Sequence, residues 1–274
     1  MPVGQLYYTT SPSRRVEPTA EHVRALVILP TYNERDNVRQ IIPAILAHDG
    51  IEALVVDDGS PDGTAAAVRE LAATHPGRVH LIEREGKFGL GTAYLNGFAW
   101  ALARDYTHVI EMDADLSHHP AALRRLLQAS RHADLVIGSR YVSGGRTVNW
   151  PAHRKLISRG GSIYARLLLN LPVRDLTGGF KCFRRLVLES IDLETVDSTG
   201  YAFQIELTYR AAISGFRIAE IPITFAERLR GESKMDSRIV IEAFVRVVRL
   251  RLSRRRTARP FALPFRPDGR APGV

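Results

Sequence analysis

The feature of this sequence that most constrains its fold is a regular alternation of short apolar segments with longer segments of helical pattern. Strands separated by helices of about 10–15 residues form β–α–β units, and such units assemble into a mostly parallel sheet flanked by helices. We therefore predict an α/β fold with a Rossmann-like sheet. The strands are expected at residues 25–30, 53–56, 79–82, 109–112 and 135–138. The first helix is expected to begin near residue 36, and the next three are expected over residues 62–73, 92–103 and 120–130.

The second half of the chain is predicted to be more helical. Its last helix carries arginines along one side and Ile, Val, Leu and Phe over most of the rest, a pattern typical of a helix that lies on an anionic membrane surface. A helix packed on the body of the protein is the alternative, and the two interpretations are compatible. Helices are expected over residues 152–170, 202–214 and 237–254, with a turn and strand at residues 178–180 and a strand over residues 216–225.

Composition and charge limit the class of protein. An apolar content of 45% and a charged content of 24% are ordinary for a globular protein. No run of about 18 apolar residues occurs, so no segment is predicted to span a bilayer. Cys182 is the single cysteine, which favours a reducing compartment. From Arg238 onward there are ten arginines and only two acids, so most of the net charge of +9 lies in the last part of the chain.

Lysine is rare in this chain. Of the 38 Lys and Arg residues, only four are lysines, so arginine is the default cation. Positions that keep a lysine are therefore predicted to need a compact ammonium group. These positions are Lys87, Lys155, Lys181 and Lys234.

Two carboxylates follow one of the predicted strands, in the segment Asp113-Ala114-Asp115. Residues two apart in extended chain point the same way, so both groups are directed at one place beyond the strand. Ligands of open α/β sheets bind at the carboxyl ends of the strands, and two carboxylates there suit a hard divalent cation that also binds a substrate diphosphate. An isolated Asp-X-Asp segment is more often a solvated turn, so the prediction depends on neighbouring motifs.

Polar segments also follow the first two strands. Pro30-Thr31-Tyr32-Asn33-Glu34 comes after one, and a segment that begins at Asp57-Asp58-Gly59-Ser60 comes after the other. Acidic groups at these strand ends can accept hydrogen bonds from ribose hydroxyls or a base edge, although each segment alone is also a common turn or helix cap. Neither a G-x-G-x-x-G nor a P-loop motif occurs, so a dinucleotide fold and a P-loop fold are not supported.

In combination, these segments resemble the polyprenol-phosphate (dolichol-phosphate) mannose synthases, which are inverting nucleotide-sugar glycosyltransferases with a GT-A fold. The match extends over about residues 24–240 and is nearest to the form without transmembrane helices. It is carried by the sequences Val-Ile-Leu-Pro-Thr-Tyr-Asn-Glu, Val-Val-Asp-Asp-Gly-Ser-Pro-Asp-Gly-Thr, Gly-Leu-Gly-Thr-Ala-Tyr, Met-Asp-Ala-Asp-Leu-Ser-His-His-Pro, Gly-Ser-Arg-Tyr, Arg-Gly-Gly, Thr-Gly-Gly-Phe-Lys, and Glu-Arg followed by Gly-Glu-Ser-Lys.

The resemblance implies a divalent metal ion, Mg²⁺ or Mn²⁺, bound by Asp113 and Asp115 with the diphosphate of the donor. Many relatives carry Gln two positions after the second Asp, where this chain has Ser117. Because serine has a shorter reach, we leave it out of the expected ligand set. The nucleotide-sugar is expected to contact Pro30, Tyr32, Glu34, Val55, Asp57, Asp113, Ala114, Asp115, Arg140, Arg228 and Lys234.

The implied reaction requires stabilisation of the charge that develops on the leaving nucleotide, which is the expected catalytic role of Asp115 and its metal ion. The implied acceptor is a lipid phosphate, which is ionised at neutral pH because its second pKa is about 6. A dedicated general base is then unnecessary and positioning dominates. Arg140, Arg154 and Ser158 are the candidates for that task, although Arg154 could equally be a solvated helix arginine.

Two further groups of polar residues have weaker support. His118 and His119 are adjacent, and no further Asp or His completes a metal spacing with them, so we expect them to support neighbouring residues. Asp197, Tyr201 and Gln204 could approach the sugar hydroxyls. Ordinary capping and packing explain the same residues, so they are not included in the predicted site.

The expected function is transfer of mannose from GDP-mannose to a polyprenyl phosphate at the cytoplasmic face of an anionic membrane, with the enzyme peripherally bound. A membrane-embedded partner protein is left open. The alternatives are transfer of glucose or another sugar from a UDP-sugar, and a membrane-binding or nucleic-acid-binding module, although no nucleic-acid motif is present. The expected parts are a flexible arm (1–23), a GT-A catalytic domain (24–235), a basic amphipathic helix (236–256) and a disordered basic tail (257–274).

Overall fold

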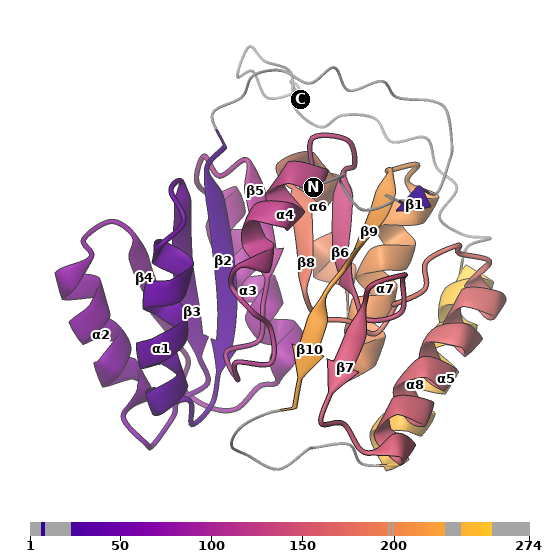
Figure 1. Ribbon diagram of the computed structural model, residues 1–274, viewed down its shortest axis with the longest axis horizontal. Helices are drawn as coiled ribbons and strands as arrows, with labels where there is room; N and C mark the ends of the chain where they lie inside the picture. The colour runs from indigo at the N-terminus through magenta and orange to yellow at the C-terminus, as the bar shows by residue number, and fades with distance from the viewer. Residues whose placement is uncertain (1–6, 9–22, 197, 199, 228–236, 254–274) are drawn as a thin grey trace, which may run out of the picture.

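The computed structural model describes residues 7–8, 23–196, 198, 200–227 and 237–253 of the chain. These residues form an eight-stranded sheet with helices on both faces and a small two-stranded sheet beside it (Figure 1). The strands are β1 (Tyr7–Tyr8), β2 (Ala25–Thr31), β3 (Ile51–Asp57), β4 (Val79–Glu83), β5 (His108–Glu111), β6 (Leu135–Ser139), β7 (Arg146–Val148), β8 (Lys181–Arg184), β9 (Ile218–Pro222) and β10 (Thr224–Ala226).

The helices form layers on the two faces of the sheet (Figure 1). One layer contains α1 (Arg35–Leu46), α2 (Thr64–Thr74) and α4 (Ala122–Ala129). The other contains α3 (Leu90–Leu102), α6 (Arg185–Ser190) and α7 (Gly200–Ile213), and α8 (Ser237–Ser253) packs between α7 and α5 (Ala152–Leu169). A short 3₁₀ helix covers Leu193–Thr195.

The large sheet has the order β1-β9-β6-β8-β5-β2-β3-β4. Strands β5, β2, β3 and β4 run parallel, and β6 runs parallel to β9. Strand β8 is antiparallel to both β5 and β6, between which it lies. The prediction of a mostly parallel sheet flanked by helices is therefore confirmed.

The predicted strand over residues 216–225 is wrong in one respect, because it forms two strands. β9 ends at Pro222 and pairs with β6, whereas β10 begins at Thr224 and pairs with β7, a strand that was not predicted. Proline cannot donate a hydrogen bond to a sheet ladder, which accounts for the break at this position. The short β10–β7 sheet places Trp150 and Phe225 beside the carboxyl edge of the large sheet, with ring centroids 5.1 Å apart.

Strand β2 is buried on both faces because its side chains alternate between two apolar clusters. Leu26 and Ile28 join the cluster on the α3 side, and Val27 and Leu29 join the one on the α1 side. Gly97 lets α3 approach β2 closely, since a Cβ atom there would lie 2.7 Å from a side-chain carbon of Ile28. Continuous burial of this kind is typical of a central parallel strand.

The same register brings the ends of three strands to one edge. Thr31 at the end of β2 is opposite Asp57 at the end of β3, and Ile28 is opposite Glu111 at the end of β5. Asp113 and Asp115 therefore follow β5 on the edge where β2 and β3 also end. The sequence-based placement of these polar segments at a common edge is confirmed.

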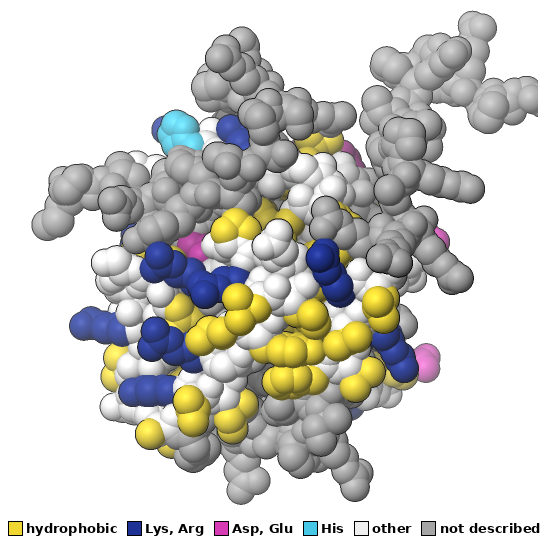
Figure 2. Space-filling model, turned by 90° about the vertical axis from the view of Figure 1, so that its right-hand side faces the viewer, with side chains coloured by type: hydrophobic (Ala, Val, Ile, Leu, Met, Phe, Trp, Pro, Cys, Tyr) yellow, Lys and Arg dark blue, Asp and Glu magenta, His cyan; other side chains and the backbone are white. Residues whose placement is uncertain are grey.

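The outer side of α5 and α8 exposes large hydrophobic side chains. Figure 2 shows this side of the molecule, where a band of hydrophobic side chains is bordered by Lys and Arg side chains. Among the described residues, no helix combines the length and apolar character needed to cross a membrane. The exposed apolar residues of the two helices are Leu156, Ile157, Ile163 and Leu167 on α5 and Phe244, Val245, Val248 and Leu252 on α8.

The proposed arm and tail lie largely or wholly outside the described residues, which include only Tyr7–Tyr8 before residue 23 and none after residue 253. Their boundaries and their disorder stay predictions. The predicted basic amphipathic helix corresponds to α8 over Ser237–Ser253.

Candidate active site

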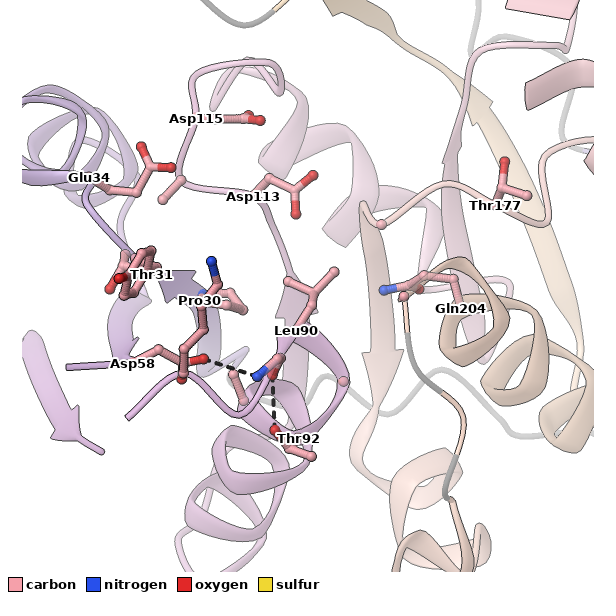
Figure 3. A pocket seen from close by; sticks show the side chains of 18 of the residues that line it. Pro30, Thr31, Glu34, Asp58, Leu90, Thr92, Asp113, Asp115, Thr177 and Gln204 are labelled. Carbon is pink, nitrogen blue, oxygen red and sulfur yellow. Dashed lines mark hydrogen bonds between the residues drawn. The ribbon is translucent and has the colours of Figure 1, made fainter. Parts of the chain in front are cut away.

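A cavity of about 430 Å³ lies at the carboxyl edge of the sheet, next to the ends of β2, β3 and β5 (Figure 3). It has two ends, with Asp113 between them. One end is lined by residues that follow β2 and β3. The other end is lined by Thr177 and Gly179, from the loop before β8, and by Gln204 from α7. The predicted site residues that line it are Pro30, Tyr32, Glu34, Asp113, Ala114, Asp115, Arg140 and Arg154.

Val55 and Asp57, also predicted to hold the nucleotide, are buried behind this lining, with 0% and 1% of their surface exposed. The Asp57 carboxylate accepts hydrogen bonds from the Thr31 hydroxyl at 2.7 Å, the Ser60 hydroxyl at 2.6 Å and the Ser60 N–H at 2.9 Å. In this arrangement Asp57 fixes Thr31 and the loop after β3. A direct contact of Asp57 with the nucleotide stays a prediction.

The neighbouring Asp58 does line the cavity. Its Oδ2 atom accepts hydrogen bonds from the N–H groups of Phe88 and Gly89, both at 3.1 Å, and its Oδ1 atom lies 3.1 Å from Nη1 of Arg84. Asp58 therefore ties the loop before α3 to the end of β3. Both aspartates were predicted to lie in one acidic segment, but only Asp57 was predicted to contact the nucleotide.

Lys87, in the same loop, lies over the ring of Tyr32 at 4.2 Å from the centroid. Both residues line the cavity, as does Phe88, whose side chain is 61% exposed. A cation, two aromatic rings and backbone groups at this end can receive a planar, electron-rich base. The rarity of lysine was the signal that singled out Lys87, although it did not reveal this position. Lys155 is exposed on α5.

Asp113 and Asp115 enter the cavity from the loop after β5. The side chain of Asp113 is 24% exposed, and Asp115 is 5% exposed with its Oδ1 atom accepting a hydrogen bond from Ser117 N–H at 3.0 Å. Leu116, which lies between Asp115 and Ser117, has a left-handed φ of 63°, an uncommon conformation for leucine that turns the chain back toward Asp115. The Ser117 hydroxyl is buried and does not line the cavity.

His118 supports Asp113 from behind. Its Nε2 atom lies 3.5 Å from Oδ2 of Asp113, and its ring packs between Phe180 and Phe225 with both centroid distances at 4.8 Å. His119 is exposed on the loop. The two histidines therefore separate, as adjacent side chains are expected to do.

The donor set at Asp113 and Asp115 fits a Mg²⁺ or Mn²⁺ ion that is shared with a diphosphate. In the described ranges, no three His, Cys, Asp or Glu residues are grouped so that they could hold a metal ion alone. Mg²⁺ is commonly bound through one or two carboxylates, substrate phosphates and water, so two carboxylates at the cavity are sufficient for this mode.

Arg140 follows β6 and is held by Asp175. Its Nε atom donates to Oδ2 of Asp175 at 2.7 Å, and Nη2 donates to Oδ1 at 2.6 Å and to the Thr177 hydroxyl at 2.9 Å. The guanidinium also lies within 5.5 Å of the ring centroids of Trp150 and Phe225. Asp175 is completely buried, so Arg140 is oriented by a desolvated ion pair at the cavity wall.

Arg154 enters the cavity from the first turn of α5. It is 7% exposed, its Nη1 atom donates to Glu227 at 2.8 Å, and its guanidinium lies 4.2 Å from the ring centroid of Trp150. Its Nε atom is buried without a hydrogen bond in the described residues. The alternative of a solvated helix arginine is therefore wrong. Ser158 lies outside the lining, where its hydroxyl accepts a hydrogen bond from Tyr141 at 2.8 Å.

A buried polar group lies beneath Asp113. Burial raises the pKa of Glu111 to about 8, an effect that the Lys181 ammonium and the Gln204 amide only partly offset, and burial lowers the pKa of Lys181 to about 8. Lys181 donates hydrogen bonds to the backbone oxygen of Gln204 at 2.6 Å and to the Thr208 hydroxyl at 2.9 Å. Lys181 therefore fixes α7 to β8 next to the cavity.

The sequence profile described as glycosyl transferase family 2 matches residues 26–192. The protein belongs to glycosyltransferase family 2. This family 2 chain is 52% identical over 239 residues to a polyprenol monophosphomannose synthase of Mycolicibacterium smegmatis, covering 85% of this chain and 90% of the relative. It is 49% identical over 236 residues to an undecaprenyl-phosphate mannosyltransferase of Micrococcus luteus, covering 85% and 96%.

Solved structures share the fold of this family 2 glycosyltransferase. A glucosyl-3-phosphoglycerate synthase from Mycobacterium tuberculosis, in complex with Mn²⁺, UDP-glucose and phosphoglyceric acid, aligns with a TM-score of 0.62 and 20% identity over 88% of this chain and 85% of that one. A mannosyltransferase from Pyrobaculum calidifontis, in complex with GDP-mannose and Mn²⁺, aligns with a TM-score of 0.54 and 18% identity over 89% and 78%. The predicted GT-A fold is confirmed.

Several cavity residues were absent from the predicted site. Thr177 and Gly179 belong to a segment that carried the resemblance, and Gln204 was considered but not included. Trp150 gave no signal in the sequence, because its place depends on the small β10–β7 sheet. Arg228 and Lys234 lie outside the described residues, and their expected phosphate contacts stay predictions.

Proposed function

We propose that this family 2 enzyme transfers mannose from GDP-mannose to polyprenyl phosphate, with inversion, giving polyprenyl-phosphate β-mannose and GDP. The observation that carries the proposal is 52% identity to a polyprenol monophosphomannose synthase across 85% of the chain. The structures with UDP-glucose or UDP bound are about 20% identical and support the fold alone. GDP-mannose is therefore preferred to a UDP-sugar as the donor.

The donor is proposed to lie along the cavity. Its nucleoside contacts Pro30, Tyr32 and Glu34, and its diphosphate reaches Asp113 and Asp115, whose bound Mg²⁺ or Mn²⁺ neutralises charge on the leaving GDP. Arg228 and Lys234 are the proposed further ligands of the phosphates.

The acceptor phosphate is proposed to bind between Arg140 and Arg154. Both guanidinium groups are buried at the cavity, where water screens their charge little, and a phosphate oxygen can pair with the Nε atom of Arg154. The phosphate is already an anion, so positioning its oxygen against the sugar carbon is the main requirement. Ser158 contributes through Tyr141 and the face of α5 rather than through the cavity lining.

The face formed by α5 and α8 is proposed to dock on an anionic bilayer (Figure 2). Leu156 and Leu167 on α5 are 75% and 70% exposed, and Leu252 on α8 is 67% exposed. The two helices pack on each other through Tyr164 and Phe244, whose rings stack at 4.1 Å. Their sequences contain eight Lys and Arg residues and a single acid, Glu242, and Figure 2 shows Lys and Arg side chains beside the apolar band, a pattern that favours an anionic surface.

Peripheral binding at the cytoplasmic face is the proposed location. The lone Cys182 is a free buried thiol, which suits a reducing compartment but does not require one. A membrane-embedded partner protein would have to bind elsewhere than the lipid-facing side of α5 and α8.

The proposal is tested by incubating the purified full chain and Mn²⁺ or Mg²⁺ with radiolabelled GDP-mannose and polyprenyl phosphate in anionic vesicles. We expect label to enter the lipid fraction, and excess GDP to inhibit transfer at lower concentration than excess UDP. Transfer from UDP-glucose with preferential inhibition by UDP would establish the alternative donor. A folded protein that labels lipid from neither donor would overturn both assignments.

A further inference from the structure

Gln204, on the second turn of α7, presents an amide to the end of the cavity that is remote from the nucleotide residues. It lines the cavity, and Figure 3 shows its side chain directed from α7 toward the interior of the cavity, on the opposite side of Asp113 from Pro30 and Asp58. Gln204 is only 2% exposed. Its position on the cavity wall is therefore combined with almost complete burial.

Neither the oxygen nor the nitrogen of the Gln204 amide makes a hydrogen bond of good geometry with the described residues. A buried amide without a partner is costly, by about 1–3 kcal/mol for each group, so such groups in folded proteins usually have one. On the protein side, the amide interacts with the Glu111 carboxyl and lowers its pKa, and on the other side it borders the cavity. The cavity is the side from which a ligand can supply the missing hydrogen bonds.

The backbone holds Gln204 in this position independently of its side chain. Lys181 donates to the Gln204 backbone oxygen at 2.6 Å, and the Thr208 hydroxyl donates to the same oxygen at 2.9 Å. Because the anchor is the main chain, the side chain is not needed to hold α7 on the sheet. A substitution of the side chain can therefore be interpreted at the cavity.

Gly179 keeps the space in front of the amide open. A Cβ atom at Gly179 would lie 3.6 Å from Nε2 of Gln204 and 3.8 Å from Oδ1 of Asp113, so both polar groups lie within 4 Å of one point. A ligand hydroxyl farther from the Gly179 backbone, in the space between these two groups, can reach both the amide and the carboxylate. The arrangement suits a polyhydroxylated ring better than an apolar group.

In a nucleotide-sugar the diphosphate lies between the nucleoside and the sugar, and this order indicates which ring would lie beside Gln204. If the diphosphate lies at Asp113 and the nucleoside lies beside Pro30 and Tyr32, the transferred sugar extends to the opposite side of the diphosphate. That side is the one lined by Gln204 and Gly179. We infer that the Gln204 amide hydrogen-bonds to a hydroxyl of the transferred hexose and so contributes to donor selection; this inference rests on the proposed function.

Replacement of Gln204 by methionine tests the inference, because methionine keeps the length of the side chain and removes its polar atoms. Binding of GDP and of GDP-mannose to the full chain with Mn²⁺ is measured by calorimetry. We expect Gln204→Met to weaken GDP-mannose binding about tenfold, the loss typical of one or two neutral hydrogen bonds, and to leave GDP binding within about twofold. The KM for GDP-mannose should rise accordingly.

The matched control is Gln128→Met, since Gln128 is exposed on α4 and remote from the cavity lining. It should bind both ligands as the wild type does. Gly179→Ala is a second variant. Its added methyl group would make only ordinary van der Waals contacts with the protein, so the fold should be kept. Because this methyl group occupies space in front of the Gln204 amide, the variant should bind GDP-mannose more weakly and GDP about as well as the wild type.

Equal weakening of GDP and GDP-mannose, or unchanged binding of both, in Gln204→Met would overturn the inference. A second test uses GDP-deoxymannose donors that each lack one sugar hydroxyl. If removal of each hydroxyl weakens binding to Gln204→Met as much as it weakens binding to the wild type, the inference is also overturned. Failure of the proposed function would instead appear in the wild type, as absence of mannose transfer to lipid, so the two failures are distinguishable.

Discussion

Asp175, which is completely buried, and Arg140, which is 6% exposed, form a bidentate ion pair at the wall of the cavity, with Nε–Oδ2 and Nη2–Oδ1 distances of 2.7 and 2.6 Å. The pair fixes a cation where we propose that the acceptor phosphate binds. Asp175 also accepts the N–H of Arg140 at 2.9 Å, so the carboxylate positions both the backbone and the side chain at the end of β6.

Asp175→Asn should therefore affect stability and turnover together. Removing one charge of a buried pair leaves the other uncompensated, so we expect a loss of about 3 kcal/mol in the free energy of unfolding and at least a tenfold fall in kcat/KM for the lipid acceptor. Urea unfolding and the transfer assay measure the two effects. Asp134→Asn, which breaks the pair with Arg217 remote from the cavity lining, should lower stability and leave kcat/KM nearly unchanged. Equal kinetic losses in the two variants would contradict the role of Asp175.

Asp115→Asn should abolish metal-dependent binding of the diphosphate. A neutral amide binds a hard cation far more weakly than a carboxylate, and we expect turnover to fall by about a hundredfold or more. The measurement is Mn²⁺ titration of the protein with and without GDP, together with loss of transfer in a chelator and its recovery on adding Mn²⁺ or Mg²⁺. Asp105→Asn, an exposed aspartate at the opposite edge, is the control. Retention of GDP-dependent Mn²⁺ binding in Asp115→Asn would refute the metal assignment.

The double variant Leu156→Gln/Leu167→Gln should bind anionic vesicles at least tenfold more weakly, because each leucine loses the free energy of inserting its apolar surface. Sedimentation with vesicles of phosphatidylglycerol and phosphatidylcholine measures the change, and added salt should weaken binding of the wild type as well. Leu186→Gln/Ile213→Gln alters exposed residues on α6 and α7 and is the control. Equal loss in the control would show that binding is not specific to α5 and α8.

His108 should make the protein sensitive to acid. Burial, with a smaller effect of Arg184, lowers the pKa of His108 to about 4 from an ordinary value of 6.5. Between these values the unfolded chain binds a proton that the folded chain does not, so stability falls as pH decreases from about 6.5 to about 4, by about 3 kcal/mol in total.

The variant His108→Gln should lose less stability than the wild type when urea unfolding is compared at about pH 7 and about pH 4.5. His132→Gln, which changes an exposed histidine, should behave as the wild type does. An identical acid response in His108→Gln would show that carboxylates alone govern the loss.

The strands around the cavity could be predicted because their causes are local. Apolar segments that end at Pro30, Asp57 or Met112 specify both a buried strand and its end. The insertion of β8 between β5 and β6 could not be predicted, since pairing across such a separation depends on the whole sheet. The division at Pro222 had a local cause that was overlooked.

The sequence predicted which segments form the site, but it did not always predict which side chains of those segments line the cavity. Asp57 and Asp58 are adjacent and chemically alike, and only the register of β3 with β2 decides which of them faces the cavity. For Gln204 the deciding property is a missing hydrogen bond, which no sequence pattern contains. Arg154 could be distinguished from a solvated arginine only when Trp150 and Glu227 were placed beside it.

One helix carries both a wall of the cavity and part of the exposed apolar face. Arg154 and Leu156 are two residues apart on α5, about 3 Å along its axis, yet one is buried in the cavity and the other is 75% exposed. With the proposed docking, a phosphate headgroup would have to rise from its leaflet by about the width of one helix, about 10 Å, to reach the arginine, while the isoprenoid tail remains among the acyl chains. Recognition would then end at the headgroup, and carriers with tails of different length should serve as substrates with similar efficiency.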